Sequence, residues 1–168
     1  MKRWYILVMW GLCRLLSQLP DDTAPQPNRK KPMIKTILKR LEGLRLHPYA
    51  DGNDQSIGYG RNLTSVGITE PEAEMLLDND VNRCEQEVRA RYDYYDGLSE
   101  IRQTAVLSLA YQLGSTRHAL FHNHHTEMAK GNFAQAAKEI YPGSLYAKQV
   151  PARAEEIAKI IESNEIFL

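Results

Sequence analysis

The sequence predicts an α+β fold that combines a small β-hairpin lobe with a larger all-helical lobe, joined by a long helix and separated by a cleft. Two observations carry this prediction. A turn-forming run at residues 51–54 is flanked by short strand-like segments, and helical apolar spacing dominates from residue 69 onward. Strands confined to one part of the chain, followed by helices, are typical of α+β proteins.

The first element is expected to be a helix from residue 33, where apolar side chains recur at helical spacing. Gly43 stands where such a helix would stop, so Glu42 lies at or near its C-terminus. Residues 44–49 and 56–59 are expected to be extended. They flank an Asp-Gly-Asn-Asp run whose residues tolerate positive φ, which indicates a hairpin.

The long helix has a strong predicted start. Thr69 suits an N-cap, Glu72 completes a capping box, and Pro71 falls in the first turn, where its missing N–H costs nothing. The apolar spacing continues to about Arg91, which gives a helix of roughly 30 Å.

The rest of the chain is expected to be helical. Residues 101–113 are apolar on most faces and predict a buried central helix that ends at Gly114. Shorter amphipathic helices are expected around residues 119–130, 133–140 and 153–162.

The composition excludes several classes of protein. The chain has 168 residues, of which 25% are charged and 43% hydrophobic, so it suits one globular domain with a real core. The 21 basic and 21 acidic residues cancel, which argues against a general nucleic-acid binder. Residues 1–32 nevertheless hold six basic and two acidic residues, which leaves 15 basic and 19 acidic in the remainder. A basic arm therefore precedes a mildly acidic body.

Residues 1–19 are expected to be a hydrophobic, signal-anchor-like segment. Lys2 and Arg3 precede an apolar run that Arg14 interrupts, and the whole is shorter than the roughly 20 apolar residues of a stable spanning helix. No small-residue cleavage pattern follows, so we expect an uncleaved anchor at residues 4–19. The alternative is an amphipathic helix packed on the body or lying on a surface.

Residues 20–32 contain four prolines and predict a Pro-rich basic linker, followed by the folded domain at residues 33–168. The two cysteines, Cys13 and Cys84, form neither a disulfide framework nor a metal set. We expect two free thiols, with a bond between them after export as the minor alternative.

Two carboxyl groups are candidates for acid–base chemistry. The negative end of a helix disfavours a charged Glu42, as a general acid requires, whereas Asp51 beside a solvated turn would stay ionised. Such an unequal pair is the minimum equipment for glycoside hydrolysis. Two ordinary surface carboxylates would show the same spacing.

A longer set of motifs decides between these alternatives. The run Glu42-Gly43-Leu44-Arg45-Leu46-x-x-Tyr49-x-Asp51, followed by Ser56-Ile57-Gly58-Tyr59-Gly60, resembles the catalytic signature of the phage-type lysozymes and endolysins of glycoside hydrolase family 24. Residues 61–63, 66–69, 72–73, 80–81, 110–114 and 144–154 resemble later elements of the family in the same order. The resemblance covers about residues 33–162, and the first 32 residues lie outside it.

The resemblance implies that Glu42 is the general acid and that Asp51 helps to activate the attacking water. Ser56 stands for the family's usual threonine, in the spacing E-x8-D-x4-S rather than E-x8-D-x5-T. Serine keeps the hydroxyl and loses the methyl group that restricts its rotamer, so we expect reduced activity as one outcome of this difference. Asp54, in the same turn, is the alternative carboxylate and ranks below Asp51.

By position, further residues are implied to line the saccharide groove: Tyr111, Gln112, Tyr146, Gln149 and Arg153. Arg153 resembles the family arginine beside the acid, where it would favour the charged form and oppose the effect of the helix end. An ordinary surface cation is the alternative.

The implied activity is that of a muramidase, a monomeric and inverting lysozyme. It would hydrolyse the β-1,4 bond between N-acetylmuramic acid and N-acetylglucosamine in bacterial peptidoglycan and so lyse the cell. The alternatives are a catalytically weak wall-binding or virion domain and a lytic transglycosylase. We expect no cofactor, no metal and no nucleic acid. The expected location is the inner membrane facing the periplasm, with the cytoplasm before export as the alternative.

Four histidines within eight residues form a competing signal: His118, His122, His124 and His125. A metal site would need a further ligand, such as Glu127, in a fixed geometry, so we expect histidines that face solvent on a turn. The nearby tyrosines at 92, 94 and 95 are expected to cap the core rather than stack on sugars.

Overall fold

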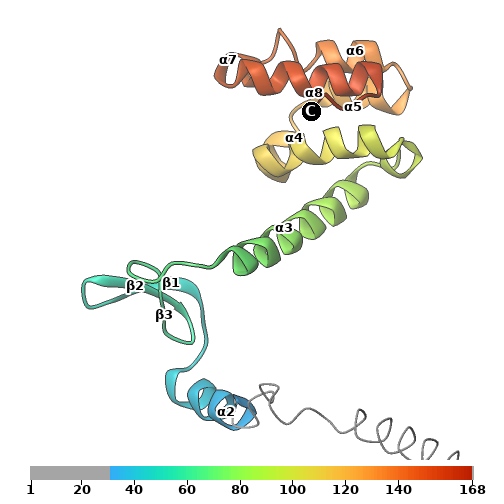
Figure 1. The fold of residues 1–168 in the computed structure, drawn as a ribbon. Coiled ribbons are helices and arrows are strands. Elements are labelled where there is room, and N and C mark those ends of the chain that lie inside the picture. The colour runs from blue at the N-terminus through green and yellow to red at the C-terminus, as the bar shows by residue number, and fades with distance from the viewer. Residues whose placement is uncertain (1–30, 168) are drawn as a thin grey trace, which may run out of the picture. The chain divides into compact units, whose positions relative to one another are not determined.

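The computed structural model describes residues 31–167, so the predicted anchor at 1–19 and most of the linker at 20–32 lie outside the described residues. Within the described part, the structure confirms an α+β fold of helices with one small antiparallel sheet (Figure 1). The chain divides into two compact units that meet in the sequence at Gly67 and Ile68. The two units are described in turn.

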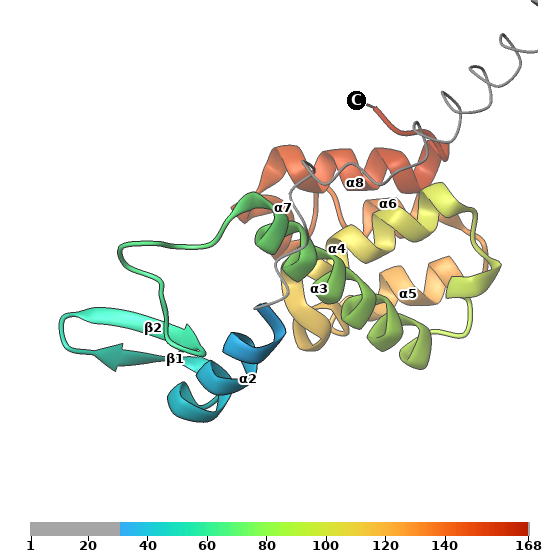
Figure 2. The same ribbon diagram turned by 60° about the horizontal axis from the view of Figure 1, so that its bottom comes forward.

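The first unit holds one helix and the sheet. Helix α2 (Lys31–Glu42) begins two residues before the expected start, and it ends where Gly43 adopts a φ of +70°. Three strands follow in the order β1 (Arg45–Asp51), β2 (Asp54–Gly58) and β3 (Arg61–Asn62), and β1 and β2 form the expected hairpin (Figure 2).

The hairpin has a tight turn and a bulge. Asp51 pairs with Asp54 across a two-residue turn whose first residue, Gly52, has a φ of +60°. The register shifts between Arg45 and Tyr49, where β1 contains Pro48. Proline has no N–H for the ladder and is confined to edges and bulges, which explains the irregularity at this point.

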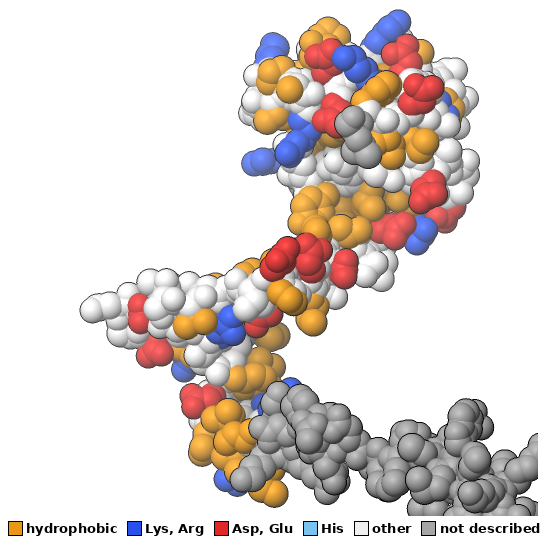
Figure 3. All heavy atoms as spheres, viewed as in Figure 1, with side chains coloured by type: hydrophobic (Ala, Val, Ile, Leu, Met, Phe, Trp, Pro, Cys, Tyr) orange, Lys and Arg blue, Asp and Glu red, His pale blue; other side chains and the backbone are white. Residues whose placement is uncertain are grey.

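The surface of the first unit is unusually apolar over its helix. Five side chains of α2 are exposed although they share helical spacing: Met33, Ile34, Ile37, Leu38 and Leu41. Figure 3 shows apolar side chains gathered over α2 and acidic ones at the start of the next helix. Among residues 32–67, the only fully buried side chain is that of Ser56. The sheet residues therefore enclose a polar centre rather than an apolar core.

The second unit is helical. Its elements are α3 (Glu70–Arg91), the 3₁₀ turn η1 (Tyr95–Gly97), α4 (Glu100–His118), α5 (His122–Ala129), α6 (Phe133–Lys138), α7 (Leu145–Gln149) and α8 (Pro151–Ser163). The five-residue α7 was not expected from the sequence. It is capped by Ser144, whose hydroxyl accepts from the N–H of Ala147 at 3.0 Å. None of the helices within residues 31–167 has the length and apolar character needed to cross a membrane.

The start of α3 confirms the predicted capping box. The Glu72 carboxylate accepts from both the backbone N–H and the hydroxyl of Thr69, each at 2.8 Å. Pro71 lies in the first turn, and the helix runs for 22 residues to Arg91, as the apolar spacing predicts.

Helix α4 forms the centre of the second unit, where it packs against α3 and α8. Four of its residues, Ala105, Val106, Leu109 and Ala110, are at most 1% exposed. Gly114 leaves the helical conformation with φ 71° and ψ 157°, and the helix then resumes to His118. The predicted stop at Gly114 is thus a kink, because glycine adopts a positive φ without strain.

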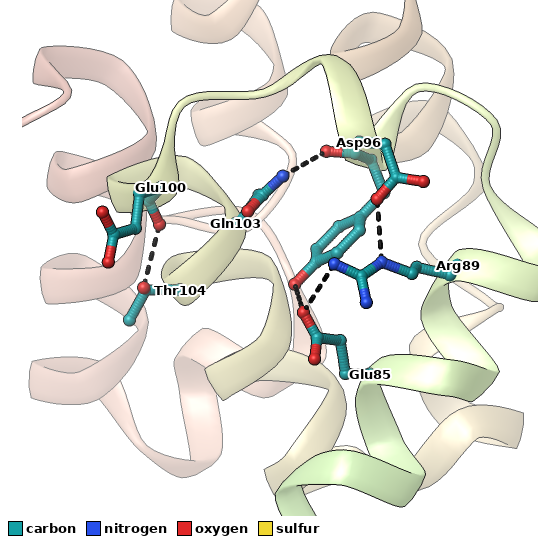
Figure 4. A network of polar contacts seen from close by, with 7 residues as sticks. Glu85, Arg89, Asp96, Glu100, Gln103 and Thr104 are labelled. Carbon is teal, nitrogen blue, oxygen red and sulfur yellow. Dashed lines mark hydrogen bonds and ion pairs between the residues drawn. The ribbon is translucent and has the colours of Figure 1, made fainter.

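A polar network holds η1 against α3 (Figure 4). Arg89 contacts the carboxylates of Glu85 at 3.1 Å and Asp96 at 2.8 Å. The hydroxyl of the buried Tyr95 donates to Glu85, and the side-chain amide of Gln103 donates to the Tyr95 carbonyl at 3.1 Å. Burial first, and then the nearby Glu85 charge, raises the pKa of Tyr95 to about 12. The end of α3 is therefore fixed relative to α4.

Arg102 connects α4 to the end of α8. Its Nε donates to the carbonyl of Ile161 at 2.8 Å, and its Nη2 donates to that of Glu162 at 3.2 Å. Its guanidinium also lies 3.6 Å from the centre of the Phe133 ring. Because the last carbonyls of a helix lack partners within the helix, these two bonds satisfy groups that nothing else in α8 can satisfy.

We predict that Arg102→Met lowers the free energy of unfolding of the full chain by about 1–3 kcal/mol. The variant keeps the apolar stem but loses two charge-assisted hydrogen bonds and the ring contact. Urea unfolding followed by circular dichroism measures the change. Arg83→Met removes only exposed ion pairs and should leave stability nearly unchanged; equal losses in both variants would contradict this role of Arg102.

Candidate active site

Glu42 occupies the position that the sequence predicts, as the last residue of α2. The side chain is exposed and lies close to the turn between β2 and β3, since a Cβ added to Gly60 would be 3.5 Å from its Oε2. Gly60 has a φ of +80°, so an L side chain would be strained there. The turn thus brings the backbone of Gly60 close to the carboxyl group of Glu42.

A hollow of about 410 Å³ opens beside this carboxyl group, lined by Lys35, Leu38, Lys39, Glu42, Tyr59 and Gly60. The Lys39 ammonium lies 5.5 Å from the centre of the Tyr59 ring, within reach of a cation–π contact. Glu42 is therefore open to a ligand on one side and bordered by cations of its own helix.

The register of the sheet decides which other candidates share a face. Asp51 pairs with Asp54, and Tyr49 pairs with Ser56. Side chains of paired residues, and of residues two apart, lie on the same face of a sheet. Asp51 and Ser56 therefore lie on one face, which we call the Ser56 face. Despite the shorter spacing, Ser56 points inward, because it is buried on the same face as Asp51.

Asn62 is a member of the Ser56 face that sequence reasoning missed. It pairs with Ser56 from the opposite strand, and its amide donates to the Asp54 carboxylate at 2.7 Å. Its own Oδ1 accepts from the N–H of Ser65 at 2.8 Å, which fixes its orientation. The signal was weak because β3 has only two residues, too few to show an alternating pattern.

The two carboxylates of the turn differ in what they contact. Asp54 is half-buried and engaged by Asn62, whereas Asp51 is exposed at the end of β1. A carboxylate held in a side-chain hydrogen bond supports the fold, and an exposed one is available to solvent and ligands. This difference supports the ranking of Asp51 over Asp54.

Ser56 lies at the centre of the Ser56 face, and its side chain is 1% exposed. A threonine would place an additional methyl group in this enclosed position. Serine provides the hydroxyl in less space, which fits the shortened hairpin.

Two of the predicted groove residues meet in the second unit. The Tyr146 hydroxyl, from α7, donates to Oε1 of Gln112, from α4, at 2.5 Å. Burial raises the pKa of Tyr146, and the nearby charge of Arg153 lowers it to a smaller extent. Tyr146 therefore lies near both Gln112 and Arg153.

Gln149 joins this group through a second hollow of about 670 Å³ within the second unit. Its lining includes Phe121, His124, Glu139, Tyr146 and Gln149, and the rings of Phe121 and Tyr146 meet edge-on at 6.4 Å. Tyr111 and Arg153 are not among the lining residues. Tyr111 is 47% exposed on α4, and Arg153 is exposed on α8.

The histidine expectation is wrong for three of the four residues. His118, His124 and His125 are 1%, 0% and 7% exposed, and only His122 faces solvent. The three buried histidines, His118, His124 and His125, pack with Tyr92 and Tyr94 into a group that we call the ring cluster. Burial lowers the pKa of His118 to about 3 and that of His125 to about 4, and it lowers the pKa of His124 as well. Polar composition suggested a surface turn, but the chain folds these rings into the helical unit.

The tyrosine expectation is confirmed. Tyr95 is buried, and Tyr92 and Tyr94 pack against His125. Cys84 is a buried free thiol whose pKa is raised by burial, and Cys13 lies outside the described residues. Within residues 31–167, no three or more potential metal ligands come together as a site.

The two units carry different kinds of functional group. The first unit contributes an accessible carboxyl group at a helix end, and its Ser56 face contributes a carboxylate beside a hydroxyl. The second unit contributes a hollow lined by aromatic and amide groups. A pair of carboxyl groups is what glycoside hydrolysis uses, and a hollow lined by aromatic and amide groups suits a sugar, so each unit by itself carries groups that fit a carbohydrate substrate.

The phage lysozyme family model matches residues 39–151 of the chain. The match spans well over half of the protein, and the chain therefore belongs to the phage lysozyme family. Membership makes it a hydrolase of the bacterial cell wall, with peptidoglycan as substrate. The matched segment includes all the candidate site residues except Arg153, which lies two residues beyond its end.

We predict that Tyr146→Phe lowers the free energy of unfolding by about 1 kcal/mol, because it leaves Oε1 of Gln112 without its donor. Urea unfolding measures this change. Tyr111→Phe, on the exposed part of α4, is the matched control and should have little effect. A Tyr146→Phe protein as stable as the wild type would show that this bond does not hold α7 to α4.

Proposed function

We propose that this phage lysozyme family member is a muramidase that hydrolyses the β-1,4 bond between N-acetylmuramic acid and N-acetylglucosamine. One observation carries the proposal. The sheet register sets Asp51 and Ser56 on one face. Both residues lie in the segment that the family model matches, and so does Glu42, the last residue of α2. The reaction needs an acid and a carboxylate that activates water, and a hydroxyl beside them can orient that water.

In this mechanism Glu42 is the general acid. It donates its proton to the glycosidic oxygen as the bond to the anomeric carbon of N-acetylmuramic acid breaks, so that N-acetylglucosamine leaves with a free 4-hydroxyl. The exposed carboxyl group beside a hollow supports this role, because a general acid must be within hydrogen-bonding reach of the leaving oxygen.

Asp51 takes part from the other side of the reaction. Its carboxylate offsets positive charge at the anomeric carbon and accepts a proton from the attacking water, which the Ser56 hydroxyl helps to orient. Attack by a water opposite to the leaving group inverts the anomeric centre, and we propose an inverting reaction on this basis. The free carboxylate of Asp51, compared with the engaged one of Asp54, supports the assignment.

Substrate contacts are assigned to Tyr111, Gln112, Tyr146, Gln149 and Arg153. Aromatic rings and amide groups bind sugars by stacking and hydrogen bonding, and neither requires an oppositely charged surface. The hydrogen bond between Tyr146 and Gln112 pre-orients two of these side chains, which lowers the entropy that binding must overcome.

Two alternative functions for the same fold make different predictions. A wall-binding or virion domain with little activity is suggested by Ser56 in place of threonine and by the short hairpin. A lytic transglycosylase would cut the same bond without water. Asp51 favours hydrolysis, because a transglycosylase needs no second carboxylate to activate water.

We predict that Glu42→Gln and Asp51→Asn each reduce the release of reducing ends from purified peptidoglycan by at least about 100-fold, with folding intact. Each change keeps the shape of the side chain and removes its proton chemistry. Circular dichroism checks the fold, and a reducing-sugar assay measures turnover.

Glu74→Gln is the matched control, since it removes an exposed carboxylate of α3 and should leave turnover unchanged. A wild-type protein that binds peptidoglycan but releases no reducing ends would contradict hydrolysis and favour the wall-binding alternative. Full activity in Asp51→Asn with loss in Asp54→Asn would transfer the role to Asp54.

We further propose that the domain organisation serves delivery to the wall. Residues 1–19 would anchor the chain in the bacterial inner membrane, residues 20–32 would act as a linker, and residues 33–168 would form the catalytic domain facing the periplasm as a monomer. The support is the sequence pattern alone, in which Lys2 and Arg3 precede the apolar run.

We predict that the full chain, expressed in a bacterium with its Glu42→Gln change to prevent lysis, sediments with inner membranes. Replacing Leu7 and Val8 by aspartate should move it to the soluble fraction, since two charges make membrane insertion of so short a segment unfavourable. Fractionation and immunoblotting measure the distribution. Recovery of the Glu42→Gln chain, with Leu7 and Val8 intact, entirely in the cytoplasm would exclude the anchor.

A further inference from the structure

The ring cluster connects three helical elements of the second unit and includes none of the proposed catalytic residues. Tyr92 follows α3, Tyr94 precedes η1, and His118 ends α4. His124 and His125 belong to α5. The cluster is therefore the place where α5 is joined to the ends of α3 and α4.

The rings are packed in a specific arrangement. His125 stacks on Tyr92 with ring centres 4.0 Å apart and planes 19° from parallel. His118 meets both rings edge-on, at 4.6 Å from His125 and 5.6 Å from Tyr92. A tilt or displacement of any one ring would disturb the other two.

The hydrogen bonds of His125 fit its neutral form. Nε2 lies 3.0 Å from the carbonyl of His118, which can only accept, so this nitrogen carries the proton. Nδ1 lies 2.7 Å from the Tyr94 hydroxyl and accepts from it. A second proton on Nδ1 would reverse this bond, so that the Tyr94 hydroxyl accepts, and would place a charge among buried rings.

The surroundings also oppose a positive charge. Arg91 from α3 and the other histidines of α5 act on both His118 and His125, and they make protonation harder. Nε2 of His118 is buried with no hydrogen-bond partner among the described residues. Two carboxylates lie at the edge of the cluster. Glu139, the C-cap residue of α6, raises the pKa of His124 but does not outweigh burial, and Glu87 of α3 lines a small space with His118 and Cys84.

We propose that the ring cluster is an acid-sensitive latch, which holds α5 against the ends of α3 and α4 while its histidines are neutral and releases α5 when they are protonated. Phe121, His122 and His124 also line the hollow that contains Tyr146 and Gln149. Release of α5 would therefore open one wall of that hollow, a consequence for activity that rests on the proposed function.

The direction of the pH effect follows from the lowered pKa values. Because the folded histidines bind protons less readily than unfolded ones, the unfolded chain gains protons first as the pH falls below about 6.5. The contribution of the cluster to stability is complete above that pH. It is lost between about 6.5 and the folded pKa, which is about 4 for His125 and about 3 for His118. At pH 5, each of these histidines raises the unfolding equilibrium constant by about 30-fold.

The test compares urea unfolding of the full chain at pH 7.5 and pH 5. We expect His118→Phe, which keeps an aromatic ring but cannot be protonated, to reduce the pH-dependent change in the unfolding constant by about 30-fold relative to the wild type. His47→Gln is the matched control, because His47 is exposed on β1, and it should leave the pH dependence unchanged. The same pH dependence in wild type and His118→Phe would overturn the latch.

Two measurements on the unmodified chain keep the proposal testable if His118→Phe does not fold. Imidazole NMR resonances of His118 and His125 should stay in the neutral position at pH 5. Hydrogen exchange, corrected for its intrinsic pH dependence, should speed up as the pH falls toward 4. The increase should begin at a higher pH in residues 122–129 than in α8. Midpoints near 6.5 for the buried histidines, or uniform exchange in α5 and α8, would refute the proposal. Neither readout depends on wall hydrolysis.

Discussion

The pairing of Asp51 with Asp54 across a two-residue turn is the constraint on which the proposed chemistry depends. A slip of one residue would move Ser56 to the opposite face and expose the only fully buried side chain among residues 32–67. Because no apolar core fixes this sheet, the register is maintained by the turn and by polar bonds. The bond from Asn62 to Asp54 performs two functions: it stabilises the pairing, and it leaves Asp51 as the free carboxylate.

The helical unit is stabilised by different means. Its core is built around α4, and polar side chains attach the surrounding elements to it: Arg89 fixes the 3₁₀ turn, Arg102 holds the end of α8, and Tyr146 bonds to Gln112. The ring cluster completes this set by holding α5 in place with neutral histidines. A stable helical scaffold thus carries the residues assigned to the saccharide, while the carboxyl groups belong to the small sheet unit.

Features that depend on neighbouring residues could be predicted from the sequence. Features that depend on packing between distant elements could not. The capping box at Thr69 and the helix stop at Gly43 depend on neighbouring residues, and both are confirmed. The family motifs also located Glu42, Asp51 and Ser56, whose positions agree with the expected helix end and hairpin. Burial of His118, His124 and His125 depends on packing between distant elements, so a polar sequence was wrongly expected at the surface. Asn62 was missed because its significance comes from pairing with Ser56.

Hydrolysis at the muramic acid carbon is the central claim, and the fate of water tests it most directly. Purified peptidoglycan should be digested with the full chain in ¹⁸O-labelled water and the products analysed by mass spectrometry. If Glu42 is the acid and Asp51 activates the attacking water, each new reducing N-acetylmuramic acid end should carry one ¹⁸O atom. Products that end in a 1,6-anhydro ring without label would contradict hydrolysis, because that ring forms when the sugar's own hydroxyl replaces water.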